Sequence, residues 1–125
     1  MEKTNFENLQ IYQLSERLAD EIWQIVVEWT NLAKDTVGKQ MIRSADSIGA
    51  NIAEGSGKGS AIDNRRFLRI ARGSLYETRH WLRRSYRRKL LTESQIIALS
   101  EIISELTPKL NSYLRSVEET IKSKK

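Results

Sequence analysis

The chain has 125 residues, a formal net charge of +5, 39% hydrophobic residues, 30% charged residues and no cysteine. The lack of cysteine excludes disulfides, thiolate metal sites and thiol nucleophiles. Six glycines and one proline are too few turn residues for a many-stranded sheet protein, and the high charge is typical of long amphipathic helices in one domain.

The first expected helix covers about residues 8–32, where apolar residues recur at spacings of three and four. Asn8 is a possible N-cap, and Trp23 lies off the apolar face, so it is our candidate for a contact between subunits. The chain opens without a basic stretch followed by an apolar run, and no apolar stretch approaches the roughly 18 residues that span a bilayer. We therefore expect a cytoplasmic protein without a membrane partner.

The second expected helix covers about residues 36–54, with Asp35 or Thr36 as its N-cap. The glycine-rich run that begins at Gly55 ends it, because glycine adopts the left-handed conformation of a helix end. This run is not a phosphate-binding loop, since no strand precedes it and Lys58 is followed by glycine. We interpret it as a flexible link.

A polar line on the second helix lies beside its apolar face. Such a line must face polar partners, and Ser74 and Glu77 on the third helix are the natural ones. We interpret it as a hydrogen-bond network between helices or subunits, and we expect Gly49 and Gly73 to let the two helices approach closely. The residues of the line are Gln40, Ser44, Ser47, Asn51 and Glu54.

The third expected helix covers about residues 61–90, with Ser60 and Asp63 as a capping pair, and it is strongly basic. Residues 60–91 contain ten basic and two acidic side chains, a net charge of +8. At about 100° per residue, six arginines and one tyrosine lie within about 40° of a single line roughly 33 Å long. We name this set the arginine stripe: Arg65, Arg69, Arg72, Tyr76, Arg79, Arg83 and Arg87.

So much like charge on one stripe is unfavourable without an anionic partner. Nucleic-acid phosphates are one such partner, and arginine in place of lysine at all six basic positions favours bidentate contacts with phosphate or carboxylate. Tyr76 is suited to stacking on unpaired bases. Two alternatives remain: ion pairs with acids of a neighbouring helix or subunit, and simple solvation. The acids available are Glu16, Asp20, Glu21, Glu101 and Glu105.

The fourth expected helix covers about residues 93–121 and begins with a Thr92–Gln95 capping box. Pro108 lies inside it and removes a backbone donor, yet the apolar periodicity continues across it. We therefore predict a kink near residues 104–108 without a break in the chain.

Four such helices with short links predict an all-α, antiparallel up-down four-helix bundle. His80 is the single histidine, so a histidine metal site is not expected. Glu54 and Glu77 as an acid pair have no nucleophile, histidine or metal set nearby in the sequence. We expect no catalytic residues, no metal, no cofactor and no enzymatic activity.

Three segments resemble a known family. They are residues 6–13, with Phe6, Leu9 and Ile11-Tyr12-Gln13; residues 40–55, with Ser47-Ile48-Gly49-Ala50-Asn51-Ile52-Ala53-Glu54-Gly55; and residues 67–77, with Gly73-Ser74-Leu75 and Glu77. Together they are similar to the four helix bundle protein family, first noted in open reading frames within intervening sequences of bacterial large-subunit ribosomal RNA. The resemblance implies a bundle that assembles as a ring-shaped homopentamer, and a relationship to the accessory variability determinant of diversity-generating retroelements, which binds nucleic acid and its reverse transcriptase.

These observations predict a non-enzymatic, oligomeric adapter that binds RNA or an RNA–DNA intermediate through the arginine stripe. A reverse transcriptase or an RNA-processing protein is the expected protein partner, besides further copies of the chain. The alternative is an interaction scaffold in which the stripe forms ion pairs at an interface. The residues expected to serve packing or assembly are Ser47, Asn51, Glu54, Gly55, Gly73, Glu77 and Trp23.

Overall fold

A computed structural model describes residues 6–124, and every regular element in that range is helical. The expected all-helical class with four long helices is confirmed. In chain order the elements are η1 (Phe6–Asn8), α1 (Gln10–Val26), α2 (Asn31–Ala33), η2 (Lys34–Gly38), α3 (Lys39–Gly57), α4 (Ala61–Arg87) and α5 (Glu93–Ser123).

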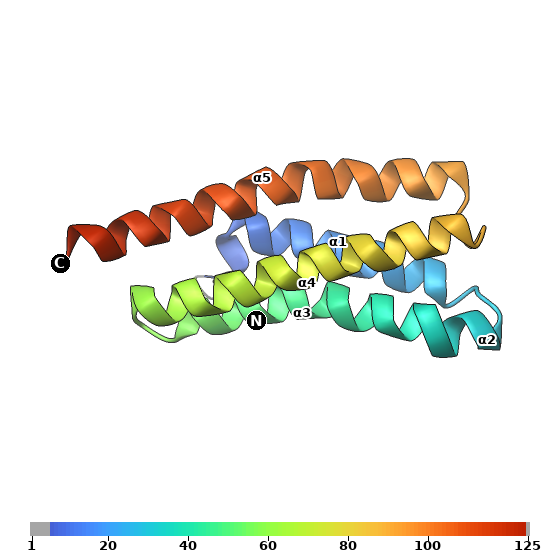
Figure 1. Cartoon of the computed structure of the whole chain (residues 1–125), viewed down its shortest axis with the longest axis horizontal. Helices are drawn as coiled ribbons and strands as arrows, with labels where there is room; N and C mark the ends of the chain where they lie inside the picture. The colour runs from blue at the N-terminus through green and yellow to red at the C-terminus, as the bar shows by residue number, and fades with distance from the viewer. Residues whose placement is uncertain (1–5, 125) are drawn as a thin grey trace.

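The four long helices run back and forth along the long axis of the molecule (Figure 1). α1 packs against α3 and α5, and α4 also packs against α3 and α5. α1 and α4 are therefore diagonal to each other. The seam between α1 and α3 and the seam between α4 and α5 consequently lie on opposite sides of the bundle.

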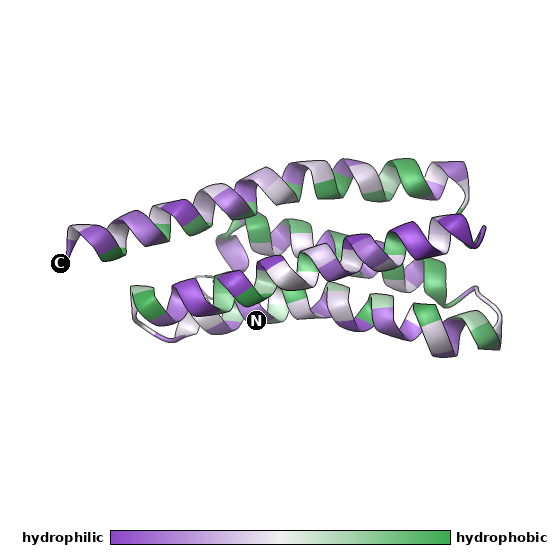
Figure 2. Cartoon of the chain, viewed as in Figure 1, coloured by the Kyte–Doolittle hydropathy of each residue, from purple (hydrophilic) through white to green (hydrophobic). Residues whose placement is uncertain are grey.

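Each long helix contributes one apolar face to a common core. Figure 2 shows this as alternation of hydrophobic and hydrophilic segments along every ribbon. Side chains spaced three or four apart meet on one side of a helix, so the periodicity of the sequence becomes a buried stripe. Core side chains with no more than 1% of their surface exposed include Leu18, Ile22, Met41, Ile48, Ile52, Leu68, Leu75, Leu106, Leu110 and Leu114.

The helix predicted over residues 8–32 is wrong at both ends. Leu9 is the N-cap of α1 and no side chain caps it, so Asn8 does not have the expected role. α1 ends at Val26, and Leu32 is 78% exposed instead of contributing to the core. Thr30 starts a new helical turn by accepting a hydrogen bond from the Ala33 amide at 3.4 Å. The apolar spacing continues across this corner, which is why the periodicity did not indicate it.

The predicted cap at Asp35 or Thr36 is also wrong. Both residues lie within η2, a short π-helical turn that leads directly into α3. The Thr36 hydroxyl donates to the carbonyl of Leu32 at 2.7 Å and so bonds to the preceding turn, not to the following one. A hydroxyl in a helix can bond backward in this way as readily as it caps a new helix.

Both caps predicted for the later helices are present. Ser60 Oγ accepts from the Asp63 amide at 3.2 Å, and Thr92 with Gln95 forms a reciprocal capping box. α5 continues unbroken through Pro108, and its ribbon changes direction near the middle (Figure 1).

α4 ends at Arg87, three residues earlier than predicted, because Lys89 adopts a left-handed backbone with φ of 59°. The Leu90 amide then donates to the Ser85 carbonyl at 2.9 Å, and the Lys89 amide donates to Tyr86 at 3.0 Å. These two bonds form a Schellman motif. The sequence did not indicate this helix end, because the left-handed position is usually glycine and here it is Lys89.

Candidate nucleic-acid interface

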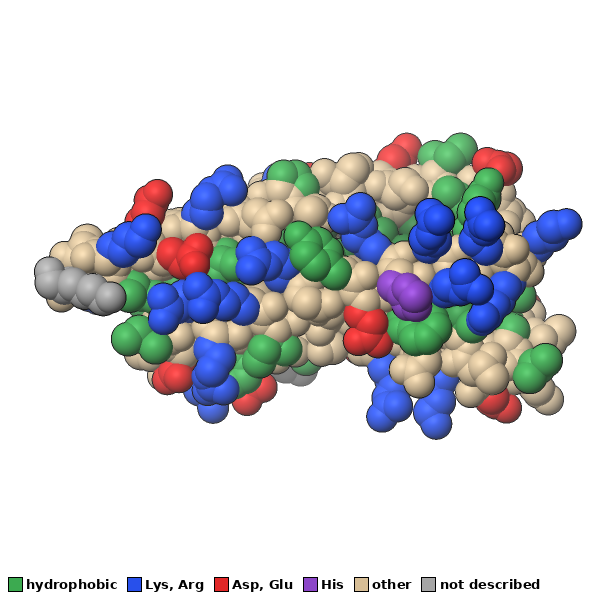
Figure 3. Space-filling view, in the orientation of Figure 1, with side chains coloured by type: hydrophobic (Ala, Val, Ile, Leu, Met, Phe, Trp, Pro, Cys, Tyr) green, Lys and Arg blue, Asp and Glu red, His purple; other side chains and the backbone are tan. Residues whose placement is uncertain are grey.

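All six arginines of the arginine stripe lie on α4 and reach solvent. Arg69, Arg79, Arg83 and Arg87 are exposed, while Arg65 and Arg72 are half-buried. Tyr76, midway along the stripe, is 50% exposed. Figure 3 shows basic side chains following this face from end to end, with few acidic ones among them. The predicted line of positive charge therefore exists as one surface.

The bundle neutralises little of this charge. Arg69 pairs with Glu118 of α5 at 2.9 Å, and Arg66 pairs with Asp63 on its own helix at 3.5 Å. Within residues 6–124, the other eight basic side chains of residues 60–91 have no carboxylate within 4.0 Å. Within residues 6–124, the ion-pairing alternative is therefore realised at only one position of the stripe, near one end of α4.

Basic residues are densest at the carboxyl end of α4. Arg84 and Arg87 lie in the last turn, followed by Arg88 and Lys89. Cations at a helix C-terminus are stabilised by the partial negative charge of its free carbonyls. Part of this cluster thus has a role in ending α4, whereas Arg69, Arg72 and Arg79 in the middle of the helix have no such role.

The polar line of the second helix forms hydrogen bonds across the seam between α3 and α4. Thr78 Oγ1 lies 2.9 Å from Ser44 Oγ, and Ser74 donates to Ser47 Oγ at 3.0 Å. Asn51 donates to the backbone carbonyl of Ser47 at 2.8 Å and to its hydroxyl at 2.9 Å, so its bonds stay within α3. The network includes the expected partner Ser74, and it also includes Thr78, which is fully buried on α4.

Two acids that were expected in this network, Glu54 of the line and its expected partner Glu77, do not take part in it. Glu77 accepts a hydrogen bond from Trp81 Nε1 at 3.0 Å on its own helix. Glu54 pairs with Lys58 at 3.8 Å, also within one helix. Neither acid joins the network between α3 and α4, because both project from the outer faces of their helices into solvent.

The expectation that Gly49 and Gly73 bring α3 and α4 together is wrong. A Cβ at Gly49 would contact Ser15 and Tyr12 of α1, and a Cβ at Gly73 would meet nothing within 4 Å. Gly55 is the glycine that permits close approach, since its Cβ would lie 2.8 Å from Phe67 Cβ of α4.

Sequence reasoning missed an acidic groove between α1 and α3, on the side opposite the α4–α5 seam. Glu16 and Asp20 of α1 and Asp46 of α3 line a hollow of about 380 Å³, with small residues along α3. Partial burial and the nearby Asp20 carboxylate raise the pKa of Asp46 above its usual range. Burial raises the pKa of the Tyr12 phenol, and the nearby Glu16, Glu7 and Asp20 raise it further. Only the pairing of two helices places these acids side by side, so no local pattern indicates the groove.

Trp23 is 53% exposed on α1, and Val27 one turn later is 39% exposed. Trp29 and Trp81 are partly buried against the core. The exposed indole leaves Trp23 available for the predicted subunit contact. Residues 6–124 contain no group of three or more potential metal-ligating side chains, and no helix in this range is long and apolar enough to cross a membrane.

Together these features define a helical bundle protein in which one long helix presents a basic face. The model of the 23S rRNA-intervening sequence protein family matches residues 7–112, and the chain belongs to this family. A similar solved structure is a protein of unknown function from the S23 ribosomal protein family of Bacteroides thetaiotaomicron VPI-5482, with a TM-score of 0.73 and 27% identity over 83% of this chain and 97% of that one. None of the curated proteins compared with the chain matches it. The expected family is confirmed, and the relationship to the retroelement accessory protein stays a prediction.

Proposed function

We propose that this protein is a non-enzymatic adapter that binds RNA through the arginine stripe of α4. The uncompensated charge of that face is the observation that carries the proposal: five of the six stripe arginines have no carboxylate partner within residues 6–124. Guanidinium groups bind phosphate in a bidentate manner, and release of counterions from the nucleic acid makes such binding favourable at low salt. Membership of a family named for ribosomal RNA supports RNA as the nucleic acid.

The test is a fluorescence-anisotropy titration with a labelled single strand at a series of salt concentrations. The affinity should fall steeply with salt, since log K decreases by about 0.7 per phosphate neutralised on a single strand. Arg79→Glu with Arg83→Glu removes two contacts, so it should weaken binding strongly and flatten the salt slope by about 1.4.

The matched control is Arg17→Glu with Arg43→Glu, which changes the net charge equally on exposed positions of α1 and α3. Equal losses in both variants would show attraction by overall charge alone and would refute an interface on α4. Absence of binding by the natural protein at low salt would refute RNA binding itself.

We further propose that the chain assembles with copies of itself into a homopentameric ring. The family resemblance supports the ring, and exposed Trp23 with Val27 supplies apolar surface for contacts between copies. A ring would multiply the positive field of α4 and increase affinity for a polyanion. Native mass spectrometry measures the number of subunits, and a monomer at micromolar concentration would contradict this proposal.

The adapter role would link RNA to a protein partner, for which a reverse transcriptase or an RNA-processing enzyme is the proposed class. The support is the resemblance to the accessory protein of diversity-generating retroelements. Co-purification of the RNA-loaded protein with such an enzyme encoded beside it is the direct test. A gene neighbourhood that encodes neither class would count against this role.

The second candidate is a scaffold in which the arginine stripe of one copy lies against the acidic groove of another. The opposite placement of the two surfaces on the bundle favours it, as does the Arg69–Glu118 pair, which shows that the stripe accepts carboxylates. In that case Arg79→Glu with Arg83→Glu would dissociate the oligomer. If the protein is an RNA adapter, the same variant should keep the oligomer mass of the natural protein and lose its affinity for RNA.

A further inference from the structure

A groove runs between α4 and α5 beside the arginine stripe. One hollow of about 460 Å³ is lined by Arg79 and Leu82 of α4 and by Ser100 and Ile103 of α5, among others. A second hollow of about 260 Å³ continues it toward Tyr86. The two hollows share Leu82 and Ser100, so they are consecutive parts of one groove. The larger part lies within the range of roughly 300–1,000 Å³ that is typical of small-molecule sites.

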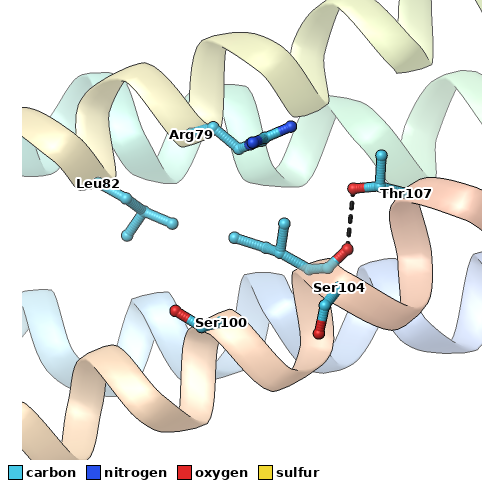
Figure 4. A pocket seen from close by; sticks show the side chains of 6 residues that line it. Arg79, Leu82, Ser100, Ser104 and Thr107 are labelled. Carbon is cyan, nitrogen blue, oxygen red and sulfur yellow. Dashed lines mark hydrogen bonds between the residues drawn. The ribbon is translucent and has the colours of Figure 1, made fainter.

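The groove stays open because α5 presents small side chains toward it. Ser100 and Ser104 lie on α5 where larger apolar residues would fill the seam. Figure 4 shows Leu82 and Ser100 reaching into the space between the helices, with Arg79 along its α4 edge. The hydroxyls of Ser104 and Thr107 are occupied by backbone carbonyls of their own helix, at 3.1 and 2.8 Å.

The walls combine two chemistries. Leu82 and Ile103 supply aliphatic surface, and Tyr86 places a half-exposed ring beside the smaller hollow. Ser100 and Arg83 also line the smaller hollow and supply polar groups there. A flat, apolar face with polar edges fits such a space, and that is the shape of a nucleobase.

The charge at the groove is uncompensated. Arg79 and Arg83 have no carboxylate within 4.0 Å among the described residues, while Glu105 and Glu118 of α5 are engaged elsewhere. Glu105 accepts from Lys109 at 2.7 Å, and both line a hollow on the α1 side of α5. Glu118 pairs with Arg69 several turns away. An anionic group is thus attracted to the rim, beside an apolar interior.

We propose that this groove accepts an unpaired base of a single-stranded RNA whose flanking phosphates contact Arg79 and Arg83. The inference rests on the proposed function, and it adds selection of single strands over duplexes. A paired base is stacked between its neighbours and cannot enter a groove without unpairing, whereas an unpaired base can stack on Tyr86 or lie against Leu82. The stripe supplies affinity for either form of RNA, and the groove discriminates between them.

The experiment compares a single strand of about 12 nucleotides, within the usual size of single-strand sites, with a duplex of equal length at low salt. Ser100→Leu with Ser104→Leu fills the groove without a change in charge. The matched control is Ser112→Leu with Ser116→Leu, the same substitutions at the same spacing on the α1 side of α5. Tyr86→Leu is a second groove variant, and circular dichroism with native mass verifies that each variant folds and assembles.

The groove-filled variant should bind the single strand about 10-fold more weakly, which is the scale of one lost stacking contact. Tyr86→Leu should also lower the affinity for the single strand. Duplex affinity should stay within about twofold, because the phosphate contacts remain. Equal single-strand affinity in the natural, groove-filled and Tyr86→Leu proteins would overturn the base site and leave phosphate binding by the stripe intact. Absence of binding to either RNA by the natural protein would overturn both proposals.

Discussion

The contact of Gly55 with α4 leads to a quantitative prediction about stability. A methyl group added there would lie 2.8 Å from Asn64 Oδ1, 2.8 Å from Phe67 Cβ and 3.3 Å from the Asn64 carbonyl oxygen. The Asn64 side chain can rotate away, but Phe67 Cβ is attached directly to the backbone of α4. Gly55→Ala must therefore push α3 and α4 apart locally.

The expected cost follows from two opposing terms. Alanine is favoured over glycine inside a helix by about 1 kcal/mol, whereas overpacking of a tight contact costs about 1–3 kcal/mol. Because the contact at Gly55 involves a backbone-anchored atom, we expect a net destabilisation of about 1 kcal/mol. Gly73→Ala is the matched control: it places the same methyl group on α4 in open space, so it should stabilise the protein by about 1 kcal/mol.

Urea unfolding followed by circular dichroism measures both variants, with the free energy of unfolding obtained by linear extrapolation. The two variants should differ by about 2 kcal/mol with similar m values. If Gly55→Ala is as stable as Gly73→Ala, the close contact between α3 and α4 does not exist as described. A loss of stability in Gly73→Ala would show that another surface covers this part of α4.

Three further predictions test single contacts. Glu118→Gln releases Arg69, so it should change stability by no more than about 0.5 kcal/mol and steepen the salt slope of RNA binding by about 0.7; an unchanged slope would place Arg69 outside the interface. Thr78→Val removes a fully buried hydroxyl that bonds to Ser44 at 2.9 Å, and urea unfolding should show a loss of about 1–2 kcal/mol; an unchanged midpoint would contradict the network. The raised pKa of Asp46 means that the folded state holds its proton more tightly, so stability is lost as pH rises above the ordinary value of 3.8. Asp46→Asn should therefore raise the melting temperature slightly at pH 7, because solvent screens most of the effect at this exposed position, and the gain should vanish below pH 3.8; a melting temperature that stays raised in acid would exclude this cause.

Local features of the sequence predicted much of the fold. The capping residues Ser60 and Thr92 and the alignment of arginines on α4 depend only on residues three or four positions apart, and such relations are fixed by helix geometry. The same rule failed at the corner after Val26, because the apolar spacing continues through Trp29 and Leu32 although the chain turns there. Periodicity reports which face is apolar, and it does not report where a helix stops.

The sequence by itself determined that four amphipathic helices form and that one of them is strongly basic, because both properties depend on residues that are close together along the chain. Only the tertiary structure decided which charged side chains meet. Arg69 meets Glu118 across 49 positions, and Asp20 meets Asp46 across a helix seam. The groove between α4 and α5 likewise exists only once both helices are packed. Contacts of this kind depend on the relative placement of whole helices, which no local pattern specifies.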